Sequence, residues 1–152
     1  MVLLLQYTLI FASVLILVAL GGCFSEHSGV VNIGLEGIMV MGALGGALMM
    51  KYLPSTMAAP LVILFVILGS VIVGMVFSLF LGVAAIHFNA DQTLVGTALN
   101  LLGPAAAVVI VRAINMSESI DNVSSTVAYK EAKKAFLVNI GKFEFSWFML
   151  LA

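Results

Sequence analysis

The chain has 152 residues, of which 63% are apolar and 9% are charged, and its formal net charge at pH 7 is −1. A soluble globular domain carries about 25% charged residues, so this composition excludes a water-soluble fold and predicts lipid as the solvent for most of the surface. The near-neutral charge excludes a strongly basic nucleic-acid binder, and the single cysteine excludes both an internal disulfide and a cysteine-based metal site.

The first apolar stretch covers residues 3–22. A cleaved signal peptide would begin with a positive charge and would have an apolar core of about 7–15 residues. Here no Lys or Arg precedes Lys51, and the apolar run is longer than such a core. We therefore expect a retained transmembrane helix.

Three further stretches, residues 35–53, 61–86 and 93–114, are long enough to cross a membrane. Each supplies about the 20 residues that a hydrocarbon core about 30 Å thick demands. The segments that separate them hold charged residues, prolines and other helix-breaking residues, which mark the ends of helices. The sequence therefore predicts four complete spanning helices.

Residues 115–144 contain four of the seven acidic and four of the six basic residues, so we expect a water-exposed loop. Within it, residues 127–136 are a candidate short surface helix. Apolar sequence resumes at residue 145, but the eight residues to the end of the chain would rise only about 12 Å as a helix. The predicted fold is an all-α polytopic membrane protein, a single transmembrane domain over residues 1–152, with four complete helices and a truncated fifth.

Small residues recur at every fourth position in two of the predicted helices. Ser70, Gly74, Ser78 and Gly82 follow one another in the third stretch, and Gly42 and Gly46 do so in the second. Membrane helices pack closely through such faces. Scatter by composition is the alternative, but four residues in strict register favour a helix contact.

The segment between the first two predicted helices, residues 21–37, mixes apolar residues with glycines and hydrogen-bonding side chains. Non-helical backbone at membrane depth needs protein or a water-filled cavity to satisfy it, so this segment is a candidate pathway-lining element. Asn32 and Glu36 lie where they would stabilise a helix start. An acid at the membrane boundary is nevertheless costly, so a role in a solute pathway stays open for both.

The fourth stretch carries a polar stripe formed by Thr93, Thr97 and Asn100, which share one helical face with Pro104. Such a stripe should face protein or water rather than lipid. One interpretation is hydrogen bonding between helices. The other is contact of Asn100 with a passing solute, and the candidate pathway residues are then Asn32, Glu36, Thr93, Thr97 and Asn100.

An enzyme is not indicated. The two histidines, His27 and His87, lie in different predicted loops, and the chain has no histidine pair at metal-ligand spacing. A Gly-rich phosphate loop followed by Lys and Ser or Thr is also absent from the sequence, so any ATP would be bound by a separate subunit. We expect neither a cofactor nor a metal in this chain.

Two motifs resemble a known family. The run GGCFSEHSGVVNIGLEG at residues 21–37 and the run FNADQTLVGTALN at residues 88–100 are similar to permease subunits of bacterial ABC importers for nucleosides and simple sugars. The resemblance covers residues 1–114. It departs from the family pattern at Asn89, where a basic residue is usual, and in the loop at 115–144, which lacks the expected prolines.

The resemblance implies the N-terminal part of a multi-pass permease in the bacterial cell membrane, which would not transport on its own. It implies a separate ATPase subunit, a second permease subunit and an extracytoplasmic solute-binding protein as partners, besides the lipid bilayer. Nucleosides are the first expected solute, simple sugars the second and branched-chain amino acids the third. A non-transporting assembly subunit is the remaining alternative.

Two arguments disagree on orientation. Positive-inside counting would place the loop at 115–144 in the cytoplasm, because one side receives Arg112, Lys130, Lys133, Lys134 and Lys142. The family resemblance places that loop outside and residues 87–92 inside. We adopt the family orientation as the expectation.

Overall fold

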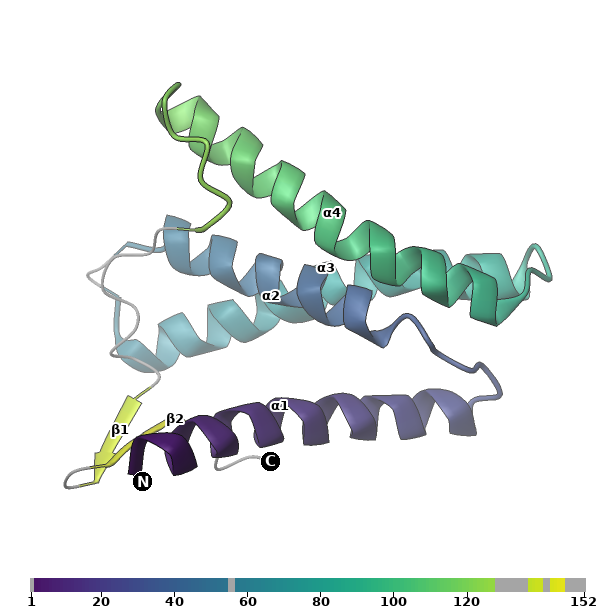
Figure 1. Ribbon diagram of the computed structural model, residues 1–152, viewed down its shortest axis with the longest axis horizontal. Coiled ribbons are helices and arrows are strands. Elements are labelled where there is room, and N and C mark those ends of the chain that lie inside the picture. The colour runs from purple at the N-terminus through teal and green to yellow at the C-terminus, as the bar shows by residue number, and fades with distance from the viewer. Residues whose placement is uncertain (1, 55–56, 128–136, 141–142, 147–152) are drawn as a thin grey trace.

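The computed structural model describes residues 2–54, 57–127, 137–140 and 143–146. These residues form four α-helices and a short antiparallel hairpin (Figure 1). The elements are α1 (Val2–His27), α2 (Leu35–Tyr52), α3 (Ala59–Ile86), α4 (Gln92–Glu118), β1 (Leu137–Ile140) and β2 (Phe143–Ser146).

The helix boundaries follow local chemistry. Asp91 precedes α4, and its carboxylate accepts hydrogen bonds from the backbone N–H groups of Thr93 and Leu94, as expected of an N-cap. Pro60 lies in the first turn of α3, where its missing N–H costs no helical hydrogen bond. Two helices are longer than predicted, since α1 continues to His27 and α4 continues to Glu118.

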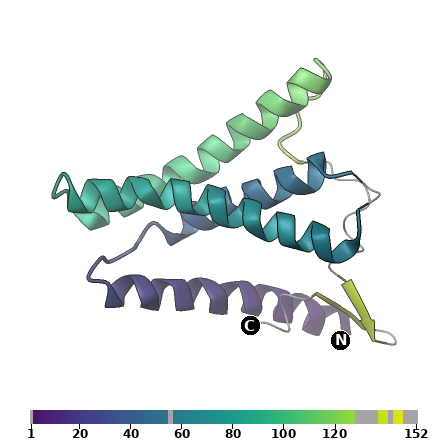
Figure 2. The ribbon, with the colours of Figure 1, turned by 180° about the vertical axis from the view of Figure 1, so that it is seen from behind.

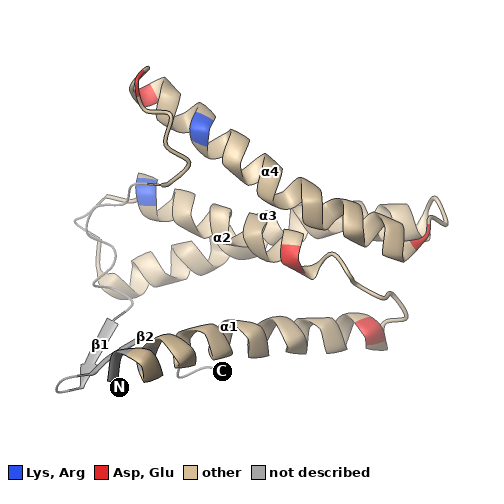
Figure 3. Ribbon diagram, in the orientation of Figure 1, with Lys and Arg blue, Asp and Glu red and all other residues tan. Residues whose placement is uncertain are grey.

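Three of the four helices in the described part of the chain are long and apolar enough to cross a membrane, namely Tyr7–His27 within α1, α3 and α4. The fourth, α2, has only 18 residues and includes Glu36 and Lys51. The predicted count of four complete spans is therefore not supported by length and composition alone. Charged residues lie at or near the helix ends and leave long uncharged stretches between (Figure 3).

The hairpin accompanies an otherwise helical fold, and a strand over residues 143–146 stands where the predicted fifth span was to begin. Strands β1 and β2 pair antiparallel, with Ile140 opposite Phe143 and Val138 opposite Phe145. Phe145 was expected to begin a helix, but β-branched and aromatic residues alternate with polar ones here, a pattern that favours strands. Residues 128–136 and 147–152 are not described, so the rest of the candidate surface helix and of the fifth span lies outside the described residues.

Helix α2 occupies the centre of the fold, packed against both α3 and α4, whereas α1 runs alongside them (Figures 1 and 2). Most α1 side chains that the structure describes are exposed. The core cluster consists of Phe77 and Leu81 from α3 and Leu99 from α4, and Ile38 and Met41 of α2 pack against it. The centre of the molecule is therefore built around α2.

The contact between α2 and α3 depends on small residues. A Cβ on Gly45 would lie 2.7 Å from the carbonyl oxygen of Gly69, and a Cβ on Gly46 would meet the hydroxyl of Ser70. A Cβ on Gly42 would lie 3.4 Å from the Ser70 carbonyl oxygen, an ordinary contact distance. The helices therefore approach so closely at Gly45 and Gly46 that a methyl group there would collide with the facing helix.

The predicted ladder on α3 is divided between two environments. Ser70 and Gly74 lie against α2, and a Cβ on Gly74 would be 3.8 Å from the Gly42 Cα. The Ser78 hydroxyl instead donates to the Met75 carbonyl of its own helix (2.8 Å). Gly82 faces open space in the described structure. Only the first half of the ladder therefore touches α2.

The contact between α2 and α4 is closer still and joins backbone to backbone. A Cβ on Gly37 would meet the Leu99 carbonyl, and one on Gly103 would lie 2.7 Å from the Gly37 Cα. A Cβ on Gly96 would lie 2.9 Å from the Gly34 nitrogen. Glycine is required here because no side chain fits between the two backbones.

We expect Gly37→Ala to destabilise the fold by about 1–3 kcal/mol, because the added methyl group overpacks the contact with α4. Gly82→Ala is the matched control, since its methyl group would meet no atom within 4 Å. Unfolding titrations in detergent micelles, followed by the loss of helical circular dichroism, measure both variants. Equal stability of the two variants would contradict the contact.

Candidate functional site

The most distinctive polar region is the junction between α1 and α2, residues 28–34, which we call the α1–α2 junction. Helix α1 ends as Gly29 takes a φ of +84°, a left-handed conformation that glycine adopts freely. The Ser25 hydroxyl then donates to the Val30 carbonyl (2.9 Å). The chain therefore leaves the helix in a fixed turn.

Side chains of α4 satisfy the backbone of this junction. The Val31 N–H donates to Oε1 of Gln92 (2.8 Å). Asn100 donates from Nδ2 to the Ile33 carbonyl (2.8 Å), and its Oδ1 accepts from the Gly37 N–H (2.9 Å). This is the condition under which non-helical backbone is tolerated at membrane depth.

Asn100 replaces the missing cap of α2. The N-cap residue is Gly34, which has no side chain and makes no side-chain capping bond. A Ser, Thr, Asp or Asn at this position would accept a hydrogen bond from the N–H at the second or third helical residue. Here Asn100 accepts from the third, Gly37, from a different helix. The Asn100 amide therefore bonds both to α2, at Gly37, and to Ile33, which precedes the N-cap residue.

Asn32 and Glu36 lie beside the two residues that Asn100 binds. Glu36 is exposed in the first turn of α2, where the helix dipole favours a negative charge. Oδ1 of Asn32 is buried and has no hydrogen-bond partner among the described residues. Buried polar atoms normally have partners, so Asn32 is an exception among the described side chains.

Thr93 and Thr97 are placed differently from Asn100. Both are exposed on α4, and the Thr97 hydroxyl donates to the Thr93 carbonyl one turn earlier (2.8 Å). The structure thus brings Asn32, Glu36 and Asn100 to the α1–α2 junction. The two threonines remain on an open helix surface.

A second polar cluster, which we call the Lys51 clasp, consists of Lys51, Asn115 and Glu118. The Lys51 ammonium lies 2.9 Å from Oε1 of Glu118 and donates to Oδ1 of Asn115 at 3.4 Å. Nδ2 of Asn115 donates to the carbonyls of Ser124 (2.8 Å) and Thr126 (3.0 Å). The clasp therefore joins the C-terminal ends of α2 and α4 to the chain that follows α4.

Asn115 is a correction to the predicted loop boundary. It was assigned to the water-exposed loop, but it is helical and only 3% exposed. Burial is possible because its amide is fully paired with Lys51 and with two backbone carbonyls. Hydropathy does not distinguish a buried, hydrogen-bonded asparagine from an exposed one, so the polar residue type alone suggested a loop.

Sequence reasoning also missed the glycines at the contact between α2 and α4. Gly34 and Gly37 are three residues apart and Gly96 and Gly103 are seven apart, both of which are same-face spacings on a helix. A search restricted to every fourth residue does not detect them. Gln92 carried no periodic signal at all, because it lies at the first turn of α4.

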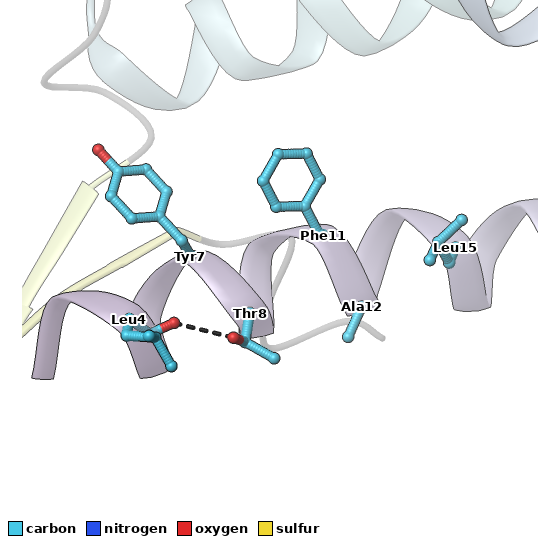
Figure 4. A pocket seen from close by; sticks show the side chains of 6 residues that line it. All are labelled: Leu4, Tyr7, Thr8, Phe11, Ala12 and Leu15. Atoms are coloured by element: carbon cyan, nitrogen blue, oxygen red, sulfur yellow. Dashed lines mark hydrogen bonds between the residues drawn. The ribbon is translucent and has the colours of Figure 1, made fainter. Parts of the chain in front are cut away.

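A hollow on α1 is a poor candidate for a site. It is lined by residues of one helix, Leu4, Tyr7, Thr8, Phe11, Ala12 and Leu15 (Figure 4). The Thr8 hydroxyl donates to the Leu4 carbonyl (2.9 Å), which leaves an essentially apolar lining. This surface suits lipid or an apolar helix rather than a polar solute.

The described residues contain no candidate metal site, because no three His, Cys, Asp or Glu side chains lie close enough together to hold an ion. Nδ1 of His27 lies 3.0 Å from the Cys23 carbonyl oxygen, inside the last turn of α1. His87 follows α3 and stacks edge to face on Phe88, with ring centroids 5.6 Å apart. Each histidine has a local structural contact.

Comparison with known proteins gives consistent matches. The profile of a family described as the permease component of branched-chain amino acid transport systems matches residues 4–152. The guanosine ABC transporter permease protein NupQ of Bacillus subtilis is 45% identical over 118 residues, which cover 76% of this chain and 36% of that protein. The nucleoside ABC transporter permease protein NupC of Lactococcus lactis is 34% identical over 121 residues, or 80% of this chain and 38% of that protein.

A shorter match links the chain to a putative glucose ABC transporter permease protein, TsgC13 of Haloferax volcanii, which is 54% identical over 43 residues, 28% of this chain and 13% of that protein. The chain spans little more than a third of the length of the two nucleoside and guanosine relatives. No solved structure matches it.

We expect Asn100→Ala to destabilise the fold by about 1–3 kcal/mol, because it leaves the Gly37 N–H and the Ile33 carbonyl without their partner. Thr97→Val is the control on the same helix, since its exposed hydroxyl bonds only within α4. Thermal unfolding in detergent compares the two. A Thr97→Val variant as unstable as Asn100→Ala would show that Asn100 does not hold α2.

Proposed function

Because this chain belongs to the family of permease components of branched-chain amino acid transport systems, we propose that it forms part of the solute pathway of an ATP-driven importer. The profile match over residues 4–152 carries this proposal. The family consists of membrane transport components rather than enzymes, so the chain is a passage for solute and not a catalyst. The helices long enough to span a membrane agree with this role.

We place the pathway beside the α1–α2 junction. Helix breaks at membrane depth occur where backbone is enclosed by protein or lines a cavity, and acids at that depth commonly mark solute or ion paths. Glu36 is exposed there, and Asn32 presents an unpartnered buried oxygen. Thr93 and Thr97 offer further hydroxyls from α4. Asn100 then acts as a positioning residue that holds the start of α2.

Nucleosides are the proposed solute. Two relatives, NupQ and NupC, are named as permeases for guanosine and for nucleosides. The chemistry agrees, because the exposed carboxylate of Glu36 is an acceptor that suits ribose hydroxyls and base N–H groups. Simple sugars are the runner-up, supported by the short match to a putative glucose permease. Branched-chain amino acids come third.

The proposed assembly lies in the bacterial cell membrane. It contains a separate ATPase subunit, which binds the ATP, a second permease subunit and an extracytoplasmic solute-binding protein. We propose that α2 also lies within the membrane, since 18 residues rise about 27 Å. Its contacts with α3 and α4 would shield its glycines from lipid.

Orientation can be tested with single cysteines in a Cys23→Ser background. In the proposed orientation the chain after α4 is outside, so Asn122→Cys should react with a membrane-impermeant maleimide in intact cells. Phe88→Cys, which follows α3 and is 72% exposed, should react only after permeabilisation. The reverse pattern would instead support the positive-inside count, which places Lys51 and Arg112 in the cytoplasm.

Function can be tested with a chimera in which residues 2–118 of this chain replace the matching segment of the Bacillus subtilis guanosine permease. We expect the chimera to restore guanosine uptake to cells that lack that permease. Glu36→Gln in the chimera should reduce guanosine uptake several-fold at unchanged membrane abundance. The matched control is Gln replacement of Glu26, an exposed acid at the end of α1.

A chimera that inserts and assembles yet takes up glucose or leucine instead of guanosine would contradict the nucleoside proposal. Equal effects of the two Gln variants would remove Glu36 from the pathway.

A further inference from the structure

The contact between α2 and α4 changes character along its length. At one end the two backbones touch through Gly34, Gly37, Gly96 and Gly103. Toward the other end α4 leans away from α2, as the views from both sides show (Figures 1 and 2). The buried residues of α4 beyond Gly103 are Val111 and Asn115, neither of them a glycine.

Pro104 marks the position where the close contact ends. It lies inside α4, directly after Gly103. A proline within a helix lacks the N–H that would bond to the carbonyl four residues earlier, here that of Asn100, and it weakens the helix locally. Prolines are also the commonest cause of helix bends. The first half of α4 is fixed to α2, and the second half begins at a weakened point.

The Lys51 clasp holds the far end of this second half. The Lys51 side chain is only 10% exposed, whereas its partner Glu118 is 53% exposed. A nearly buried ammonium needs its partners, because removing them leaves a desolvated charge unpaired. The Glu118 carboxylate is open to water, so the ion pair between Lys51 and Glu118 can separate without exposing the apolar core.

The segment that follows α4 also stabilises the C-terminal end of this helix. It turns back toward the end of α2 (Figure 1), and Asn115 holds it through the carbonyls of Ser124 and Thr126. Ser124 and Thr126 hydroxyls lie 2.6 Å apart and stabilise this return. The separation of α2 and α4 at this end is therefore bridged by polar contacts rather than by close packing.

We propose that residues 104–118 of α4 are a gate that swings about Gly103 and Pro104, and that the Lys51 clasp holds it closed against α2. Asn100 and the four glycines form the pivot. The role of this gate in solute passage rests on the proposed function, whereas the motion itself is a property of α2 and α4. Lys51, Asn115 and Glu118 are then positioning residues of the transporter.

The motion can be measured by electron paramagnetic resonance on the full 152-residue chain in lipid nanodiscs, with Cys23→Ser as background. Spin labels at Tyr52→Cys and Met116→Cys report the gate, and labels at Met39→Cys and Leu102→Cys report the pivot. All four positions are exposed. Circular dichroism checks that each variant keeps its helices.

Opening the clasp by Glu118→Gln or by Lys51→Met should broaden the gate distances toward longer values and leave the pivot distances unchanged. The exchange Lys51→Glu with Glu118→Lys should restore the narrow distribution. Adding Pro104→Ala to Glu118→Gln should narrow the distribution of gate distances again, because alanine stiffens α4 at this position. Unchanged gate distances in both single variants, or equal broadening of gate and pivot, would overturn the gate.

The link to transport is tested separately in the guanosine permease chimera. Joining Tyr52→Cys to Met116→Cys with a bifunctional, reducible thiol cross-linker should lower guanosine uptake at least tenfold, and reduction should restore it. Full uptake with the cross-link formed would overturn the gating role. The distance measurements in nanodiscs need neither solute nor ATPase, so they test the gate motion even if the chimera fails to transport.

Discussion

The fold depends on one demand, that every buried backbone N–H and C=O in a lipid environment finds a partner within the protein. The helices meet it internally, but the chain must break between α1 and α2, and there α4 supplies the partners. Gln92 binds Val31, and Asn100 binds both Ile33 and Gly37. These bonds require α4 to lie against the start of α2, which in turn requires glycine at the contact.

The central position of α2 explains why it differs from the other helices. A helix that faces lipid must be apolar over its whole length, whereas one enclosed by α3 and α4 can carry glycines on two faces and charges near both ends. The Gly34 and Gly37 face meets α4, and the Gly42, Gly45 and Gly46 face meets α3. Its glycines and its two charged residues, Glu36 and Lys51, are thus compatible with its position between α3 and α4.

Hydropathy predicted all four helices and six of their eight boundaries to within two residues, because an apolar run of about 20 residues is typical of a membrane helix. The ends of α1 and α4 lie further along the chain than predicted. Periodicity predicted half of one packing face, since Ser70 and Gly74 touch α2 and Gly82 does not. The bonds of Asn100 and the pairing of Lys51 with Glu118 join residues more than 60 positions apart, so no local pattern contains them. The hairpin at β1 and β2 was missed because Phe145 was interpreted by apolarity rather than by alternation.

The cap on α2 comes from 63 residues further along the chain, and this separation bears on how the protein is made. Synthesis is vectorial, at about 5–20 residues per second, so α2 emerges several seconds before Asn100 exists. During that interval the Gly37 N–H has no Asn100 to bind. In the proposed arrangement, with α2 inside the membrane, stable entry of α2 into the bilayer is tied to the arrival of α4, and the three helices α2 to α4 form a single unit of membrane insertion.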